Sequence, residues 1–235
     1  MFTYEFLQNY WWAIISLLGG LLVFLMFVQG GNSLIFITKD EEERQLIVNS
    51  TGRKWEFTFT TLVTFGGAFF ASFPLFYSTS FGGAYWVWIL LLVTFVFQAV
   101  SYEFQTKLGN LLGRNTFRTF LLINGCLGPF IVGAAVSTFF TGSDFIVNKA
   151  AVGESLAPTI SVWGNEWHGL EALANPFTIA FGLTVMFLTQ VLGGMYMQGS
   201  IEDERLEEKL VRAVRWTSGL FLAAFLACMA MLLTM

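Results

Sequence analysis

The chain has 235 residues, of which 55% are hydrophobic and 12% are charged, and its mean hydropathy is +0.66. This balance excludes an ordinary soluble domain and indicates an integral membrane protein. The formal charge of −4 is accompanied by no basic tract, so nucleic acid is not an expected partner.

Six apolar segments follow one another, each long enough to cross the roughly 30 Å hydrocarbon core of a bilayer as a helix. They predict an all-α bundle that forms one transmembrane domain, 1–235, with helices at about 7–29, 55–76, 85–103, 117–140, 175–197 and 201–235. The first helix has an aromatic belt near its start and lacks the basic region and cleavage site of a signal peptide. The last begins with a charged half that lies outside the membrane.

The connections carry the signals for helix ends. Residues 35–54 are rich in charge and predict a solvated loop, helical in part. Asn175 and Pro176 suit the N-cap and first position of the fifth helix. Ser200 followed by Asp203 predicts a capping box before the last helix.

Basic residues set the expected orientation. Eleven of the twelve lysines and arginines lie in the connections after the first, third and fifth helices, and the exception is Lys149 in the long loop 141–174. Because basic residues are retained on the cytoplasmic side, the N-terminus is predicted to lie outside.

The second and third helices form a hairpin with an uncharged turn and a carboxylate at each open end, Glu56 and Glu103. Both are expected at the cytoplasmic edge. Glu56, Thr60 and Thr64 share one helix face, and their row of hydroxyls could hold water and relay protons inward. Alternatively, Glu56 reaches to the interface and the threonines bond their own helix carbonyls.

Other polar residues have simpler interpretations. Glu103 has Lys107 one turn away as an ion-pair partner, and Gln98 is expected to bridge helices. Cys126 and Cys228 lie far apart without metal-ligand spacing, so both are expected to be packing residues.

A membrane haem needs axial histidine or methionine ligands, and this chain has one histidine, His168, in a loop. It is expected to be a loop hydrogen-bonding residue. Met186, Met195 and Met197 have no histidine at matching depth and are expected in the core. No catalytic, cofactor-binding or metal-ligating set is therefore predicted on this chain.

Several short motifs are spread over the whole chain: Tyr4-Glu5-Phe6-Leu7 with Trp11-Trp12, Gly52-Arg53-Lys54-Trp55-Glu56, residues 65–71 with Pro74 and Tyr77, Ser101-Tyr102-Glu103-Phe104, and Asn175-Pro176-Phe177. Together they resemble subunit II of bacterial cytochrome bd-type quinol oxidases.

The resemblance implies a multi-pass protein of the bacterial inner membrane that pairs with a haem-bearing subunit I. That subunit carries haem b and haem d, and the complex oxidises quinol and reduces O2 to water with cytoplasmic protons. Membrane lipids and a small accessory subunit are further expected partners. The Trp-acid pair of the family's proposed proton path corresponds to Trp55 and Glu56.

The chain departs from the family's best-known version at three places. Two aspartates at the end of the first helix are replaced within Val28-Gln29-Gly30-Gly31-Asn32, and an arginine of the third helix corresponds to Gln98. The family normally has eight helices and six are predicted here, so the sequence is either a fragment or a naturally short version, and a last helix that ends without a polar flank favours a fragment truncated at its C-terminal end. A small proton-coupled secondary transporter and a purely structural membrane subunit remain alternative functions.

Overall fold

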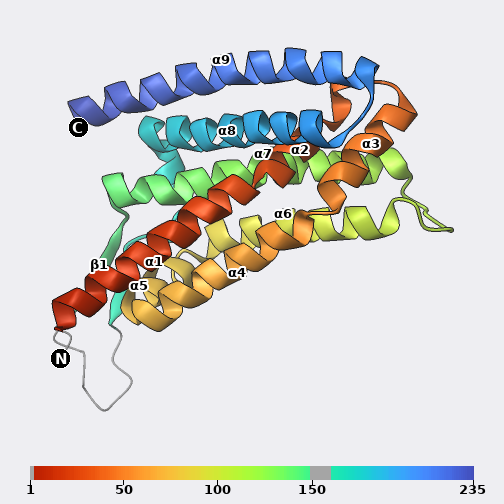
Figure 1. Ribbon diagram of the computed structural model, residues 1–235. Coiled ribbons are helices and arrows are strands. Elements are labelled where there is room, and N and C mark those ends of the chain that lie inside the picture. The colour runs from red at the N-terminus through yellow and green to blue at the C-terminus, as the bar shows by residue number, and fades with distance from the viewer. Residues whose placement is uncertain (1–2, 149–159) are drawn as a thin grey trace.

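The computed structural model describes residues 3–148 and 160–235, and it is an elongated bundle of helices (Figure 1). Its longer helices run roughly side by side, and both chain termini lie at the same end of the bundle. The helices longer than seven residues are α1 (Tyr4–Leu25), α3 (Glu41–Gly52), α4 (Trp55–Ser72), α6 (Tyr85–Phe104), α7 (Arg114–Thr141), α8 (Pro176–Ser200) and α9 (Glu204–Thr234). The shorter elements are α2 (Phe27–Ser33), η1 (Ile35–Ile37), α5 (Pro74–Tyr77), η2 (Ser78–Gly82), η4 (Leu170–Ala174) and the antiparallel strands β1 (Phe145–Val147) and β2 (Ser161–Trp163).

The expectation of an all-α membrane protein is confirmed at this level, since the two three-residue strands are the only ones in the described part of the chain. Five helical stretches of the described residues are long and apolar enough to cross a membrane: Tyr4–Ile37, Tyr85–Phe104, Arg114–Thr141, Pro176–Ser200 and Glu204–Thr234. The α4 helix, with its acidic residue and several threonines, is not among the five. The prediction of six spanning helices therefore stays a prediction.

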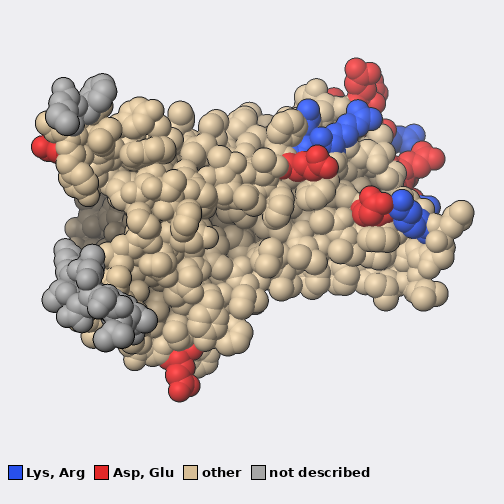
Figure 2. Space-filling view, turned by 90° about the horizontal axis from the view of Figure 1, so that it is seen from below, with Lys and Arg blue, Asp and Glu red and all other residues tan. Residues whose placement is uncertain are grey.

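Positive charge gathers at one end of the bundle. The eleven described lysines and arginines lie on α3 and the segments beside it, on the α6–α7 connection with the start of α7, and around the α8–α9 connection. Figure 2 shows these blue side chains together at one end of the molecule, which we call the basic end. The hairpin turn, β1 and β2 lie at the opposite end.

Three local predictions need correction. The predicted second helix, 55–76, stops at Ser72, because Phe73 precedes Pro74 and adopts an extended φ of −134°. Residues 35–54 are helical in part, as predicted, because they contain α3, but the segment is not simply solvated, since α3 buries Ile47 and Val48. The capping box at Ser200 is wrong, because Asp203 itself is the N-cap and accepts the N–H of Leu206.

The first predicted helix, 7–29, is divided at Met26 into α1 and α2, which extends it to Ser33. The α1 helix is largely exposed, whereas α2 is buried from Phe27 to Asn32. At the start of α8 the prediction is confirmed, because Asn175 accepts the N–H of Phe177 and Pro176 is the first helical residue.

The α2 helix packs closely against both α7 and α8 through glycines. A Cβ atom at Gly30 would lie 1.7 Å from the carbonyl oxygen of Thr189, and one at Gly193 would lie 2.2 Å from the amide nitrogen of Gly31. On the other side, a Cβ at Gly125 would lie 2.5 Å from the amide nitrogen of Ser33. Only glycine allows these backbones to approach so closely.

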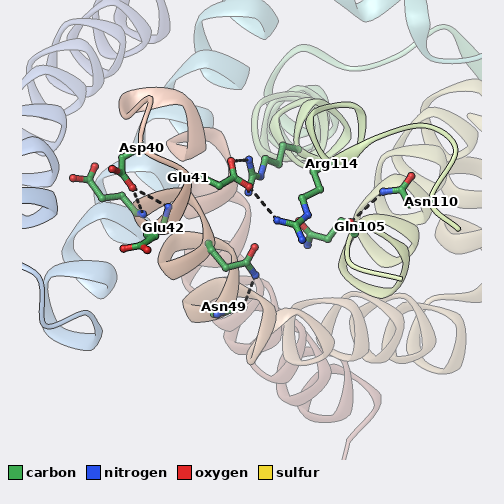
Figure 3. A network of polar contacts seen from close by, with 10 residues as sticks. Asp40, Glu41, Glu42, Asn49, Gln105, Asn110 and Arg114 are labelled. Carbon is green, nitrogen blue, oxygen red and sulfur yellow. Dashed lines mark hydrogen bonds and ion pairs between the residues drawn. The ribbon is translucent and has the colours of Figure 1, made fainter. Parts of the chain in front are cut away.

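At the basic end, α3 is held to α7 by ion pairs (Figure 3). The guanidinium of Arg118 is fully buried and donates two hydrogen bonds to Glu41, at 2.6 and 2.7 Å. Arg114 lies 3.4 Å from the same carboxylate. The hydrogen bonds from Arg118 lower the pKa of Glu41 below its ordinary value of 4.5, and the nearby charges act in the same direction.

The glycine contacts predict different effects for two substitutions in the same helix. Gly193→Ala should destabilise the protein by about 1–3 kcal/mol, because the methyl group meets the α2 backbone, which cannot move aside cheaply. Gly199→Ala is the matched control, since nothing lies within 4 Å of its Cβ. Thermal unfolding of the purified protein would separate the two, and equal melting temperatures would contradict this account of the packing.

The Arg118–Glu41 pair predicts a pH-dependent stability difference. Glu41→Gln should destabilise the protein by about 1–3 kcal/mol near neutral pH, because it leaves a buried guanidinium without its counter-charge. A carboxyl whose pKa is lowered by folding stabilises above its unfolded pKa, so the difference should shrink as the pH falls below about 4.5. The measurement is melting temperature against pH, with the exposed neighbour Glu42→Gln as control. A difference that is constant with pH would exclude this role.

Candidate functional site

The sequence-predicted residues lie at the open end of the α4–α6 hairpin, which is part of the basic end. Trp55 and Glu56 begin α4, and Glu103 lies in the last turn of α6. Glu56, Thr60 and Thr64 are exposed on one face of α4, as their spacing predicts. Among the residues that the structure describes, none forms an ion pair with Glu56.

Two simple interpretations from the sequence are confirmed. Glu103 pairs with Lys107 at 2.8 Å, and because both side chains are about 60% exposed the pair contributes little to stability. The Thr64 hydroxyl donates to the Thr60 carbonyl of its own helix at 2.8 Å. A hydroxyl bonded in this way can still accept a hydrogen bond from water.

Trp55 connects the open end of the α4–α6 hairpin to the interior of the bundle. Its half-buried ring stacks on Tyr102 of α6, with ring centroids 6.2 Å apart and planes 29° from parallel. Gly52 leaves room for this arrangement, because its Cβ would lie 3.1 Å from the Tyr102 ring. The residue beside Glu56 therefore touches a side chain that reaches into the bundle.

Tyr102 is one member of a polar column between α2, α3, α6 and α7. Its hydroxyl donates to Asn32 Oδ1 at 2.6 Å and lies 3.0 Å from Thr51 Oγ1. One turn before Tyr102 in α6, Gln98 Oε1 accepts a hydrogen bond from Gln29 Nε2 at 3.1 Å. The polar column consists of Gln29, Asn32, Thr51, Thr94, Gln98, Tyr102 and Asn124, and apart from half-buried Tyr102 its members are at most 1% exposed.

Several amide atoms of the polar column have no hydrogen-bond partner among the described residues: Gln29 Oε1, Asn32 Nδ2, Gln98 Nε2, and both Oδ1 and Nδ2 of Asn124. A buried amide group without a partner costs about 1–3 kcal/mol. The column is therefore polar, neutral and incompletely satisfied by protein groups.

Sequence reasoning expected Gln98 to bridge helices, and the hydrogen bond to Gln29 confirms that expectation. It did not identify Tyr102, Asn32 or Thr51 as members of a site. The spacing of Thr94, Gln98 and Tyr102, four residues apart along a predominantly apolar helix, is a signal that could have found the α6 part.

His168 lies at the opposite end of the bundle. Its Nδ1 atom is 3.0 Å from the carbonyl oxygen of Gly83, and its ring packs against Tyr85 and Trp163. It is thus a loop hydrogen-bonding residue, as predicted. An apolar cavity of about 360 Å³ lies nearby, lined mainly by aromatic and aliphatic side chains of α4, α6 and α7.

Comparison with known proteins gives the family. The family model described as cytochrome bd terminal oxidase subunit II matches residues 7–235. The cytochrome bd-I ubiquinol oxidase subunit 2 of Escherichia coli K12 is 28% identical over 200 residues, which are 84% of this chain and 50% of that protein. A probable cytochrome oxidase subunit 2 of Haemophilus influenzae has the same identity and coverage.

A further relative is the cytochrome bd ubiquinol oxidase subunit 2 of Bacillus subtilis, 27% identical over 141 residues, or 58% of this chain and 41% of that protein. The chain thus spans about half the length of the curated relatives that it matches. The family match covers the helices described above except for the first three residues of α1. The chain belongs to the cytochrome bd terminal oxidase subunit II family.

Proposed function

We propose that this chain serves as the haem-free subunit II of a quinol oxidase complex in the bacterial inner membrane. The family match over residues 7–235 is the observation that carries the proposal. In the overall reaction, two quinols give up four electrons and four protons, and O2 takes up the same numbers to form two molecules of water. The chain's part is to support the subunit that performs this chemistry and to help deliver protons.

The residues of this chain do not fit a haem. Haem b and haem d require axial side-chain ligands, and the one histidine is engaged with Gly83 and two aromatic rings in a loop. Met197 is buried in a cluster of aliphatic side chains at the basic end. The haems are therefore assigned to the partner, subunit I.

The partner and the lipids need an apolar surface, and the helices supply one. Large apolar side chains are exposed along the outer faces of α1, α4 and α6, among them Leu17, Val63, Phe70 and Leu92. In a bilayer such faces contact acyl chains or another membrane subunit. A small accessory subunit could use the same surface. With the basic end placed in the cytoplasm, the N-terminus lies outside.

Proton delivery is assigned to the open end of the hairpin. Glu56 is an exposed carboxylate at the basic end and can exchange protons with the cytoplasm. Thr60 and Thr64 continue the same face toward the membrane interior, and Trp55 links it to the polar column through Tyr102. Glu103 is a weaker candidate, because Lys107 already pairs with it.

The complex itself can be tested by co-purification. The tagged protein, produced from its full reading frame and extracted from native membranes in mild detergent, should bring with it a second subunit and a reducible haem absorption spectrum. A tagged protein of the same membranes outside the family is the control. Purification of the chain without any haem-bearing partner would contradict the proposed function.

The proton role predicts an activity loss without haem loss. Glu56→Gln keeps the side-chain shape and removes the titrating group, so oxygen consumption by the assembled complex should fall several-fold while haem content stays constant. Glu103→Gln should have a smaller effect. Glu207→Gln, an exposed carboxylate at the same end, is the inert control. Unchanged turnover with Glu56→Gln would remove this residue from the pathway.

A further inference from the structure

The polar column cannot satisfy its amides with protein groups alone. Gln29 and Gln98 share one hydrogen bond, which leaves the Oε1 atom of Gln29 and the Nε2 atom of Gln98 without a partner. Turning both amides by 180° exchanges the roles of oxygen and nitrogen but leaves the same number unpaired. Asn124 has neither its oxygen nor its nitrogen bonded, so turning it changes nothing.

Two glycines of α7 near Asn124 have different surroundings. At Gly125 a Cβ would overlap the α2 backbone, so close helix contact explains that residue. At Gly128 a Cβ would lie 3.5 Å from Thr94 Oγ1, 3.6 Å from Asn124 Nδ2 and 3.9 Å from Gln29 Cγ, which are ordinary van der Waals distances. The backbone at Gly128 therefore leaves room for a methyl-sized group beside polar atoms of Thr94 and Asn124 and the aliphatic stem of Gln29.

The next residue removes the usual hydrogen-bond donor of a carbonyl in the same turn. Pro129 has no N–H, so the carbonyl of Gly125 lacks its normal helical hydrogen bond. In membrane helices, ordered water is one of the groups that satisfy a carbonyl freed in this way. A methyl-sized space, unpaired amides and a freed carbonyl thus occur within one turn of α7.

We propose that Gly128, Asn124, Thr94 and Gln29 form a binding site for an internal water molecule. The Thr94 hydroxyl donates to the carbonyl of Leu91 and can accept a hydrogen bond from this water. The unpaired oxygens of Asn124 and Gln29 can accept as well, while Asn124 Nδ2 can donate to it. Two to four such partners are what a buried water requires.

Water fits this site better than other small ligands. A cation would need carboxylates or a surplus of acceptors, but the members of the polar column are neutral and their amide nitrogens are donors. An acyl chain would leave the amides unpaired, and Gln29, Thr94 and Asn124 are at most 1% exposed. The water would join α2, α6 and α7 in one hydrogen-bonded group.

The direct test is a high-resolution electron-microscopy map of the intact complex from native membranes. A water peak within hydrogen-bonding distance of Asn124 and Thr94 would support the proposal. A map that shows other internal waters but no peak at Gly128 would overturn it.

Substitution gives an independent test, because an occupied site and a dry site predict changes of opposite sign in the melting temperature. If water occupies the site, the methyl group of Gly128→Ala displaces it and leaves Asn124 unpaired, so the melting temperature should fall by about 2–4 °C. If the site is dry, the methyl group fills space and improves helix propensity, so the melting temperature should rise. A rise would overturn the proposal.

Two further variants control this measurement. Gly219→Ala in α9 has nothing within 4 Å of its Cβ and should not lower the melting temperature. In an Asn124→Ala background the amide that loses its water is absent, so Gly128→Ala should be less harmful there than in the native protein. Equal losses in both backgrounds would contradict a water held by Asn124.

Discussion

The close contact of α2 with α7 and α8 is the constraint on which the interior of this protein depends. Lipid chains are as apolar as leucine side chains, so membrane helices associate through packing and hydrogen bonds and not through the hydrophobic effect. Glycines at 30, 125 and 193 allow backbone to touch backbone on both sides of one short helix. This approach carries the amides of Gln29 and Asn32 into the bundle, where the polar column forms.

The polar column and the open end of the hairpin around Glu56 contain polar side chains of different kinds. At the basic end the ionisable side chains are exposed or paired, whereas the polar column holds neutral amides and hydroxyls. A charge buried at this depth would be costly to desolvate, but a neutral amide costs little once it is hydrogen-bonded. Trp55 and Tyr102 form the physical contact between the two regions.

How far the sequence predicted these features depended on the range of the interactions. The apolar segments, the Asn175 cap and the Glu103–Lys107 pair are local in the chain, and their spacing was sufficient. The break at Phe73 was also local, but the influence of Pro74 on the residue before it was overlooked. The polar column joins residues about seventy positions apart, and spacing within a single helix cannot reveal such partners.

The two ends of the bundle are held by contacts of different kinds. At the basic end, Glu41 and Glu43 pair with basic residues of α7 and α9 through partly exposed charges. At the opposite end, Trp163 donates to the carbonyl of Thr79, and His168 lies against that of Gly83. Ionic strength screens the exposed carboxylate of Glu41 in part, although less than it would a fully exposed pair, and it has little effect on the second kind of contact. Salt should therefore weaken the contacts at the basic end more than those that fix the hairpin turn to Trp163 and His168.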